Sequence, residues 1–270
     1  MAKYLRSIQA GRWRYDYTYS KVNRRDCDKA RAEKAKASSK AQKTVNDKLS
    51  RLQLTGILAA NFTDRKSAMF VTLTFDEDHY PTAARKSQRR KQVEKEAVNY
   101  IDRLGYLARN RKKKFRRVWF IGLGEQGRYH IHVVVDGLTG EDVRDCWGRG
   151  NVDYHHLYDK KWLKERDWYS KKFRGANPVQ IAKYAMQNAN ERPTGKHPWH
   201  ASRNCQRPTS APARLIADGV SIDPPDSCEL LDKTETNTIY SQCAAVEYIL
   251  PFAPSCSGRS RKPKSGQQRR

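Results

Sequence analysis

The sequence is short of acidic residues and lacks long apolar runs and paired cysteines. Its longest apolar run lies around residues 69–75, far shorter than the roughly 20 residues of a membrane span. No apolar segment begins the chain either, because Lys3, Arg6 and further cations interrupt its start. The six cysteines form no C-x-x-C pair and no zinc-knuckle spacing, so we expect free thiols. The sequence therefore predicts a protein of the reducing cytoplasm with no membrane segment.

Basic residues far outnumber acidic ones. The chain holds 54 Lys and Arg against 29 Asp and Glu, which gives a formal net charge of +25. A surplus of this size repels itself in a compact protein unless a polyanion compensates it. Nucleic acid is the expected polyanion, since each neutralised phosphate releases condensed counterions. Charge alone does not distinguish an enzyme from a protein that only binds nucleic acid.

The composition changes along the chain and divides it into four segments. We expect a basic N-terminal leader at residues 1–60, a catalytic domain at 61–205, an acidic region at 206–255 and a basic, disordered tail at 256–270. Within the leader, residues 26–54 could form a solvated helix or an arm that becomes ordered on DNA.

The hydrophobic pattern of the middle segment predicts both strands and helices. β-Branched and aromatic residues predict strands at 68–75, 117–122 and 129–136, and the short turn between the last two predicts a hairpin. Apolar residues at helical spacing within 85–117 predict a helix with one packed and one basic face. An Asn-Pro pair begins a further predicted helix at 177–190. These elements predict an α+β fold.

His130 and His132 are the most informative residues. Two positions apart on a predicted strand, their side chains leave the same face with roots roughly 6.5–7 Å apart, so both imidazoles can converge on one ion. Glu125, across the predicted hairpin, could add the carboxylate oxygen that favours Mg²⁺ or Mn²⁺. The plainer alternatives are two histidines that pack or face solvent, and a turn glutamate in water.

Tyr184 is one of 14 tyrosines, so its setting is more informative than its identity. One face of the predicted helix carries Gln180, Lys183, Tyr184 and Gln187, which would place the lysine beside the hydroxyl. A phenol with an ordinary pKa near ~10 is a poor nucleophile at neutral pH. Lys183 could favour the phenolate or stabilise charge that develops on a phosphoryl group. A packed aromatic side chain is the alternative interpretation.

Three motifs resemble, in order, those of the HUH superfamily of rolling-circle replication initiators, found in single-stranded DNA phages and plasmids. Residues 70–75 resemble the first motif, a central strand. Residues 124–136 resemble the metal motif, with a glutamate a few residues before His-x-His, and residues 180–187 resemble the tyrosine helix. The resemblance covers about residues 66–205. Many phage members carry a first tyrosine where this chain has Gln180, so the resemblance supports a single tyrosine.

The resemblance implies a fold and a reaction. Helices would flank a central antiparallel sheet of about five strands, a palm similar to that of ferredoxin-like proteins. Mg²⁺ or Mn²⁺ held by His130, His132 and Glu125 would polarise a phosphate of single-stranded or extruded origin DNA, and Tyr184 would attack it. The products would be a 5′-phosphotyrosine link and a free 3′-hydroxyl, and reversal would re-join the strand. Host helicase and DNA polymerase are the implied partners, in the cytoplasm of a bacterial host.

Basic side chains outside these motifs are the expected contacts to the DNA backbone, which position the strand without reading its bases. The predicted phosphate-binding residues are Lys112, Lys113, Lys114, Arg116, Arg117 and Arg128. The chain has no G-x-x-x-x-G-K-[ST] loop, so we expect neither a nucleotide cofactor nor an attached helicase.

Two other functions remain open at this point. A non-catalytic nucleic-acid-binding protein would have the same charge without the chemistry. Gly124, His130, His132 and Asp136 also resemble the first half of a cupin metal motif, although cupins normally have glutamate at the last position. A second cupin histidine motif is not evident in the sequence. Manganese-dependent nicking of an oligonucleotide separates an enzyme from a binding protein.

Overall fold

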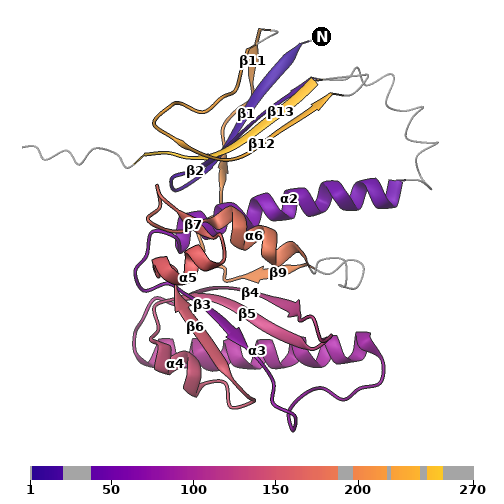
Figure 1. The fold of residues 1–270 in the computed structure, drawn as a ribbon, viewed down its shortest axis with the longest axis vertical. Helices are drawn as coiled ribbons and strands as arrows, with labels where there is room; N and C mark the ends of the chain where they lie inside the picture. The colour runs from indigo at the N-terminus through magenta and orange to yellow at the C-terminus, as the bar shows by residue number, and fades with distance from the viewer. Residues whose placement is uncertain (1, 21–37, 188–196, 218–219, 238–241, 252–270) are drawn as a thin grey trace, which may run out of the picture.

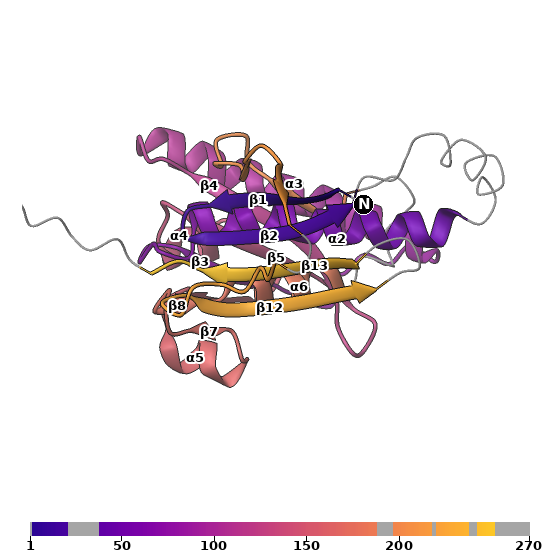
Figure 2. The ribbon, with the colours of Figure 1, turned by 90° about the horizontal axis from the view of Figure 1, so that it is seen from above.

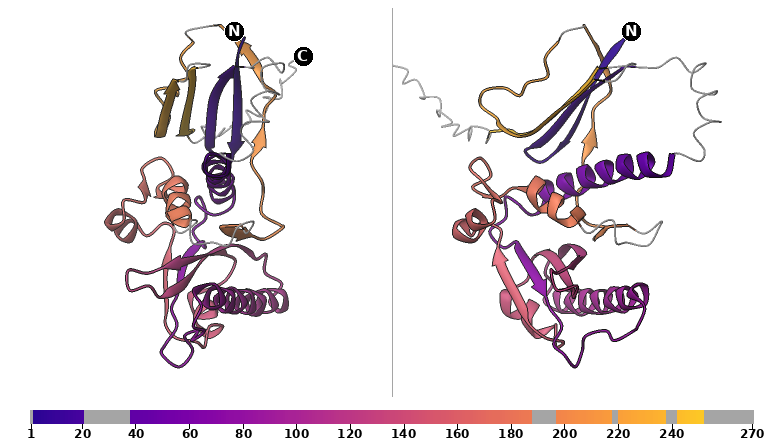
Figure 3. Two further views of the ribbon diagram at one scale, coloured as in Figure 1. Left: turned by 90° about the vertical axis from the view of Figure 1, so that its right-hand side faces the viewer. Right: turned by 45° about the vertical axis from the view of Figure 1, so that its right-hand side comes forward.

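The structure is a computed structural model, and it describes residues 2–20, 38–187, 197–217, 220–237 and 242–251. These residues form two large antiparallel sheets, with a long helix between them (Figures 1 and 3). The predicted tail at 256–270 lies outside the described residues, as does the first part of the predicted arm at 26–54.

The central sheet has five strands, each antiparallel to its neighbours. Their spatial order is β6 (Val152–His156), β3 (Met69–Leu73), β5 (Tyr129–Asp136), β4 (Arg116–Leu123) and β9 (Trp199–Ala201). β4 and β5 pair along their whole length as a hairpin, and β3 lies on the other side of β5. The three predicted strands and the predicted hairpin are confirmed, and β5 occupies the middle of the sheet.

Helices cover both faces of the central sheet (Figure 1). On one face lies α3 (Lys86–Asn110), whose predicted apolar stripe is buried against the sheet, with α4 (Gly140–Asp145) nearby. On the other face lie α2 (Ser38–Asn61), α5 (Lys160–Glu165) and α6 (Pro178–Gln187). Alternate residues of β5 serve the two faces, because successive side chains of a strand point in opposite directions. The α+β fold with flanking helices is confirmed.

The second sheet joins the two ends of the chain. Its main path runs β10 (Thr209–Ser210), β1 (Lys3–Ala10), β2 (Trp13–Ser20), β13 (Gln242–Ile249) and β12 (Glu229–Asn237), and β11 (Arg214–Ile216) also pairs with β1. Figure 2 shows the four longer strands side by side. β2 pairs with β13 from Trp13↔Ile249 to Tyr17↔Ala245. Strands from the predicted basic leader and the predicted acidic region therefore fold together.

Helix α2 is the common support of both sheets (Figure 3). Leu54, Ile57 and Leu58 pack into the core of the central sheet, whereas Leu52 and Ala59 pack against the second sheet. Residues three and four apart on a helix share a face, so one helix can present apolar stripes to two neighbours. α2 also carries Arg51, which forms a buried ion pair with Glu247 of β13. This pairing explains how acidic and basic segments compensate each other.

The remaining described residues include a small two-stranded sheet, β7 (Tyr169–Ser170) and β8 (Gly175–Ala176), which leads into α6. The described cysteines, Cys146, Cys205, Cys228 and Cys243, are free thiols as expected, and the other two lie outside the described residues. Within the described part of the chain, no helix is both long and apolar enough to cross a membrane.

Candidate active site

His130 and His132 lie next to each other on the face of the central sheet that α6 covers. Their ring centroids are 4.5 Å apart and the ring planes meet at 81°, so the prediction that both leave the same face is confirmed. His132 is 3% exposed, in the middle of the sheet, and His130 is half-buried nearer the hairpin turn. The period of two along β5 directs both side chains away from α3.

Tyr184 of α6 meets this histidine pair. Its hydroxyl lies 3.0 Å from Nε2 of His132, at hydrogen-bond distance. The start of α6 is set by Asn177, whose Oδ1 accepts a hydrogen bond from the backbone N–H of Val179 at 3.0 Å, and by Pro178 at the first helical position. The buried face of α6 then packs into the core beneath the sheet. The histidine strand and the tyrosine helix, identified separately in the sequence, therefore form one site.

Aromatic rings surround the Tyr184 side chain. Ring centroids of Phe70, Phe120 and Trp168 lie 6.4, 6.1 and 5.3 Å from that of Tyr184. Phe70 and Phe120 also flank His132. Such packing restricts the tyrosine ring to one position, which is what a nucleophile aimed at a single atom requires.

A glycine opposite His130 makes room for its imidazole. Gly122 of β4 is the cross-strand partner of His130. A Cβ atom on Gly122 would lie 2.2 Å from Nε2 of His130, far inside van der Waals contact. Glycine in the middle of a strand often marks a close approach by another group. This residue was missed in the sequence, although its place within an otherwise apolar strand was a usable signal.

Burial keeps both histidines neutral. Desolvation lowers the pKa of His132 well below its ordinary value, and the neighbouring His130 lowers it further. Burial also lowers the pKa of His130, against a hydrogen bond to the backbone of Arg128 that raises it. Oγ1 of Thr72 lies 3.2 Å from Nδ1 of His132, so the ring is held from its far side while Nε2 faces Tyr184. Neutral, oriented imidazoles are the form that binds a metal ion.

The environment of Tyr184 favours its protonated form. Burial raises the pKa of the phenol, and the charge of Arg166 lowers it in part. Arg166 follows α5, and its guanidinium stacks on the ring of Trp162 at 4.6 Å from the centroid. Arg166 was not found in the sequence analysis, because it lies on a different element from the tyrosine and belongs to no motif. The site therefore needs a further positive charge before the phenolate can form at neutral pH.

Two predicted site residues are not brought to the others. Glu125 is exposed in the turn between β4 and β5. Among the described residues, no three or more His, Cys, Asp or Glu side chains form a group that could hold a metal ion, so Glu125 does not join the histidine pair here. Lys183 points toward the second sheet, where its Nζ lies 3.9 Å from Oδ2 of Asp232 on β12. Adjacent residues of a helix do not face the same way.

The predicted phosphate-binding residues are in different settings. Lys112, Lys113 and Lys114 are exposed in the loop after α3. Arg128 stacks on Tyr80 at 4.4 Å and forms an ion pair with the exposed Glu77. The lysines are therefore open to a phosphate, and Arg128 would have to exchange a surface partner for one.

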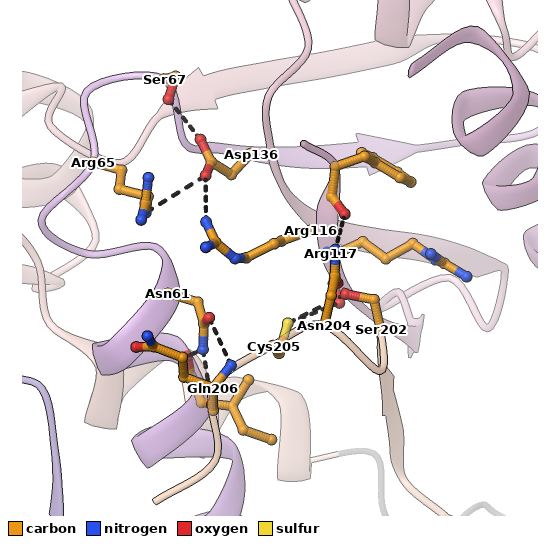
Figure 4. Close-up of polar contacts among 12 residues, drawn as sticks. Asn61, Arg65, Ser67, Arg116, Arg117, Asp136, Ser202, Asn204, Cys205 and Gln206 are labelled. Atoms are coloured by element: carbon orange, nitrogen blue, oxygen red, sulfur yellow. Dashed lines mark hydrogen bonds and ion pairs between the residues drawn. The ribbon is translucent and has the colours of Figure 1, made fainter. Parts of the chain in front are cut away.

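Arg116 and Arg117 are successive residues of β4 that point to opposite sides (Figure 4). Arg116 is buried, and its Nη1 lies 3.3 Å from Oδ2 of Asp136, which also accepts a hydrogen bond from Ser67. The structure thus gives Arg116 a place in the core, away from any DNA surface. Arg117 is half-buried and points away from this cluster.

Residues 68–190 match the model of a family described as replication-associated protein ORF2. The matched segment runs from β3 to α6, so it contains the histidine pair and the tyrosine. The resemblance to rolling-circle replication initiators of single-stranded DNA phages is confirmed, and the segment that carries the three motifs belongs to this family. Comparison with curated proteins and comparison with solved structures find no match.

Proposed function

We propose that the protein is a replication initiator that nicks single-stranded or extruded origin DNA through Tyr184. The observation that carries the proposal is the 3.0 Å approach of the Tyr184 hydroxyl to His132, beside a second neutral histidine on the same strand. A nucleophile within reach of a metal-binding pair is the arrangement that phosphoryl transfer to tyrosine requires. The strong positive charge of the chain supports DNA as the substrate.

His130 and His132 would hold a divalent ion, Mg²⁺ or Mn²⁺, with Glu125 as the proposed third ligand. The two imidazoles fit such an ion, because both are neutral and adjacent and His132 is oriented by Thr72. A bound ion would supply positive charge for the scissile phosphate and for the tyrosine oxygen. Glu125 would have to turn inward from its exposed position to complete the set.

The protein's own groups would position the strand and the nucleophile. The rings of Phe70, Phe120 and Trp168 hold the Tyr184 side chain, and they keep bulk water from its buried edge. As the tyrosine oxygen bonds to phosphorus, its proton passes to solvent, the bond from phosphorus to the 3′ oxygen breaks, and that oxygen takes up a proton. Arg166 and Lys183 are the nearby cations proposed to favour the charged forms.

The reaction would leave DNA linked to the protein by a 5′-phosphotyrosine bond. The free 3′-hydroxyl would be extended by a host polymerase behind a host helicase. Because the covalent link conserves the energy of the phosphodiester, attack by a new 3′-hydroxyl would re-join the strand without a nucleotide cofactor.

A denaturing gel tests this function directly. The protein is incubated with Mn²⁺ and an origin-derived single strand labelled on the 3′ side of the nick, and transfer of label to protein is followed. We expect an adduct with the native chain, none with Tyr184→Phe, and an undiminished adduct with the control Tyr158→Phe, which changes a tyrosine that is 48% exposed. Peptide mapping that places the DNA on another tyrosine would contradict the proposal.

A further inference from the structure

A cavity of about 570 Å³ lies on the opposite face of the central sheet from Tyr184, between α3 and the edge formed by β4 and β9. Trp119, in its wall, belongs to the core under α3, whereas its neighbour Phe120 belongs to the core under α6. The cavity is therefore separated from the candidate active site by the thickness of the sheet. Its volume is within the range of pockets that hold small organic ligands.

Cations and flat rings line this cavity. Its wall includes Asp102, Arg117, Trp119, His200 and Arg203. His200, an exposed residue of β9, stacks on Trp119 with ring centroids 4.2 Å apart and planes 16° from parallel. Arg203 is exposed at the rim. Aromatic platforms beside arginines are the means by which proteins hold single nucleic-acid strands, since bases stack on the rings and phosphates meet the cations.

Arg117 is a half-buried cation whose charge is not compensated by direct contact. Among the described residues its guanidinium makes no ion pair or hydrogen bond, and it lies over the ring of Phe115 at 5.5 Å. Burial lowers its pKa, against the charge of Asp102, which raises it from beyond ion-pair distance. A partly desolvated guanidinium is a strong site for a phosphate, to which it can donate two hydrogen bonds.

The wall around Arg117 is rigid (Figure 4). The backbone N–H of Arg117 donates to Oγ of Ser202 at 3.2 Å, and the N–H of Ser202 donates to the carbonyl of Arg117 at 2.9 Å. The side-chain amide of Asn204 donates to the carbonyl of Phe115 at 2.8 Å. These bonds tie the segment after β9 to β4, so the cavity is formed before any ligand arrives.

We propose that this cavity is a second binding site for single-stranded DNA, in which a nucleotide's base stacks against His200 and its phosphate binds Arg117 and Arg203. An unpaired base is required, because a base inside a duplex has no face to offer to the ring. Asp102, the only acid among the described lining residues, opposes the phosphate. The site lies outside the nicking machinery, so it would hold a flanking part of the strand and would function whether or not Tyr184 cuts it.

Fluorescence anisotropy with a labelled oligothymidylate tests the proposal in the uncleaving Tyr184→Phe background. We expect Arg117→Gln to reduce the slope of log affinity against log salt by about 0.7, the value for one phosphate contact with a single strand. His200→Ala should weaken binding by roughly fivefold or more, as loss of a stacking ring does. Asp102→Asn should strengthen binding. The matched control is Lys66→Gln, which removes one charge at an exposed position that lines none of the described cavities.

Two results would overturn the proposal. The first is an affinity and a salt slope in Arg117→Gln and His200→Ala that equal those of Lys66→Gln. The second is an equal loss of affinity for duplex DNA, since paired bases cannot stack on His200. Photocrosslinking of a bromouracil-substituted strand to the peptide that contains His200 would support the site independently. Because these measurements record binding alone, failure of the nicking reaction does not affect them.

Discussion

Substitution of Gly122 by alanine is the sharpest test of the histidine geometry. The new Cβ atom would lie 2.2 Å from Nε2, 2.7 Å from Cδ2 and 2.9 Å from Cε1 of His130, so the imidazole has to leave its position. The ring is the end of a side chain, and it can rotate away at a cost of roughly 0.5–1.5 kcal/mol. Alanine in place of glycine restricts the unfolded chain and stabilises the fold by about 0.4–1 kcal/mol. The two effects oppose each other, so we expect the free energy of unfolding to change by less than ~1 kcal/mol.

Nicking should respond much more strongly than stability. Loss of an oriented group next to a metal site typically lowers metal affinity or activity by about 10–100-fold, and we expect Gly122→Ala to fall in that range. The measurements are the rate of adduct formation as a function of Mn²⁺ concentration and the midpoint of urea unfolding. Gly124→Ala is the matched control, because a Cβ there would lie 3.8 Å from the nearest His130 atoms, in ordinary contact.

A double-mutant cycle decides whether the effect passes through His130. In the His130→Ala background the obstructed ring is absent, so Gly122→Ala should cause no further loss of activity. A native nicking rate in the single Gly122→Ala variant would refute the reasoning. Equal losses from Gly122→Ala with and without His130 would refute it as well, because the glycine would then act by another route.

Three further predictions concern other parts of the molecule. Glu125→Gln should raise the Mn²⁺ concentration needed for half-maximal nicking by at least about tenfold, and an unchanged requirement would exclude Glu125 as a ligand. Arg166→Gln should slow adduct formation more than Lys183→Gln does, because only Arg166 acts on the Tyr184 phenol in the structure; the reverse order, measured under single-turnover conditions, would contradict this. Arg51→Met should lower the free energy of unfolding by about 3–5 kcal/mol, since it leaves Glu247 buried without its partner. A loss below about 1 kcal/mol in urea titration, the level of a surface pair, would show that the contact is dispensable.

Features that depend on local periodicity were predictable from the sequence. Alternation along residues 129–136 required His130 and His132 to share a face, and the structure has them 4.5 Å apart. The spacing of Val93, Tyr100 and Leu104 required a helix with one buried face. The order of the three motifs pointed to the replication-associated family, which the comparison confirmed. Each of these inferences involves residues that are close in the chain, where backbone geometry alone relates one side chain to the next.

Contacts between distant segments were decided only by the tertiary structure. Composition separated the basic start of the chain from the acidic region after residue 206, yet β2 and β13 pair because each needs a neighbour for its backbone hydrogen bonds. Helical position placed Lys183 near Tyr184, but each step along a helix turns the side chain, and the lysine faces Asp232 while Arg166 from another element acts on the phenol. Partners of this kind are chosen by packing across the fold, and no spacing within one segment encodes them.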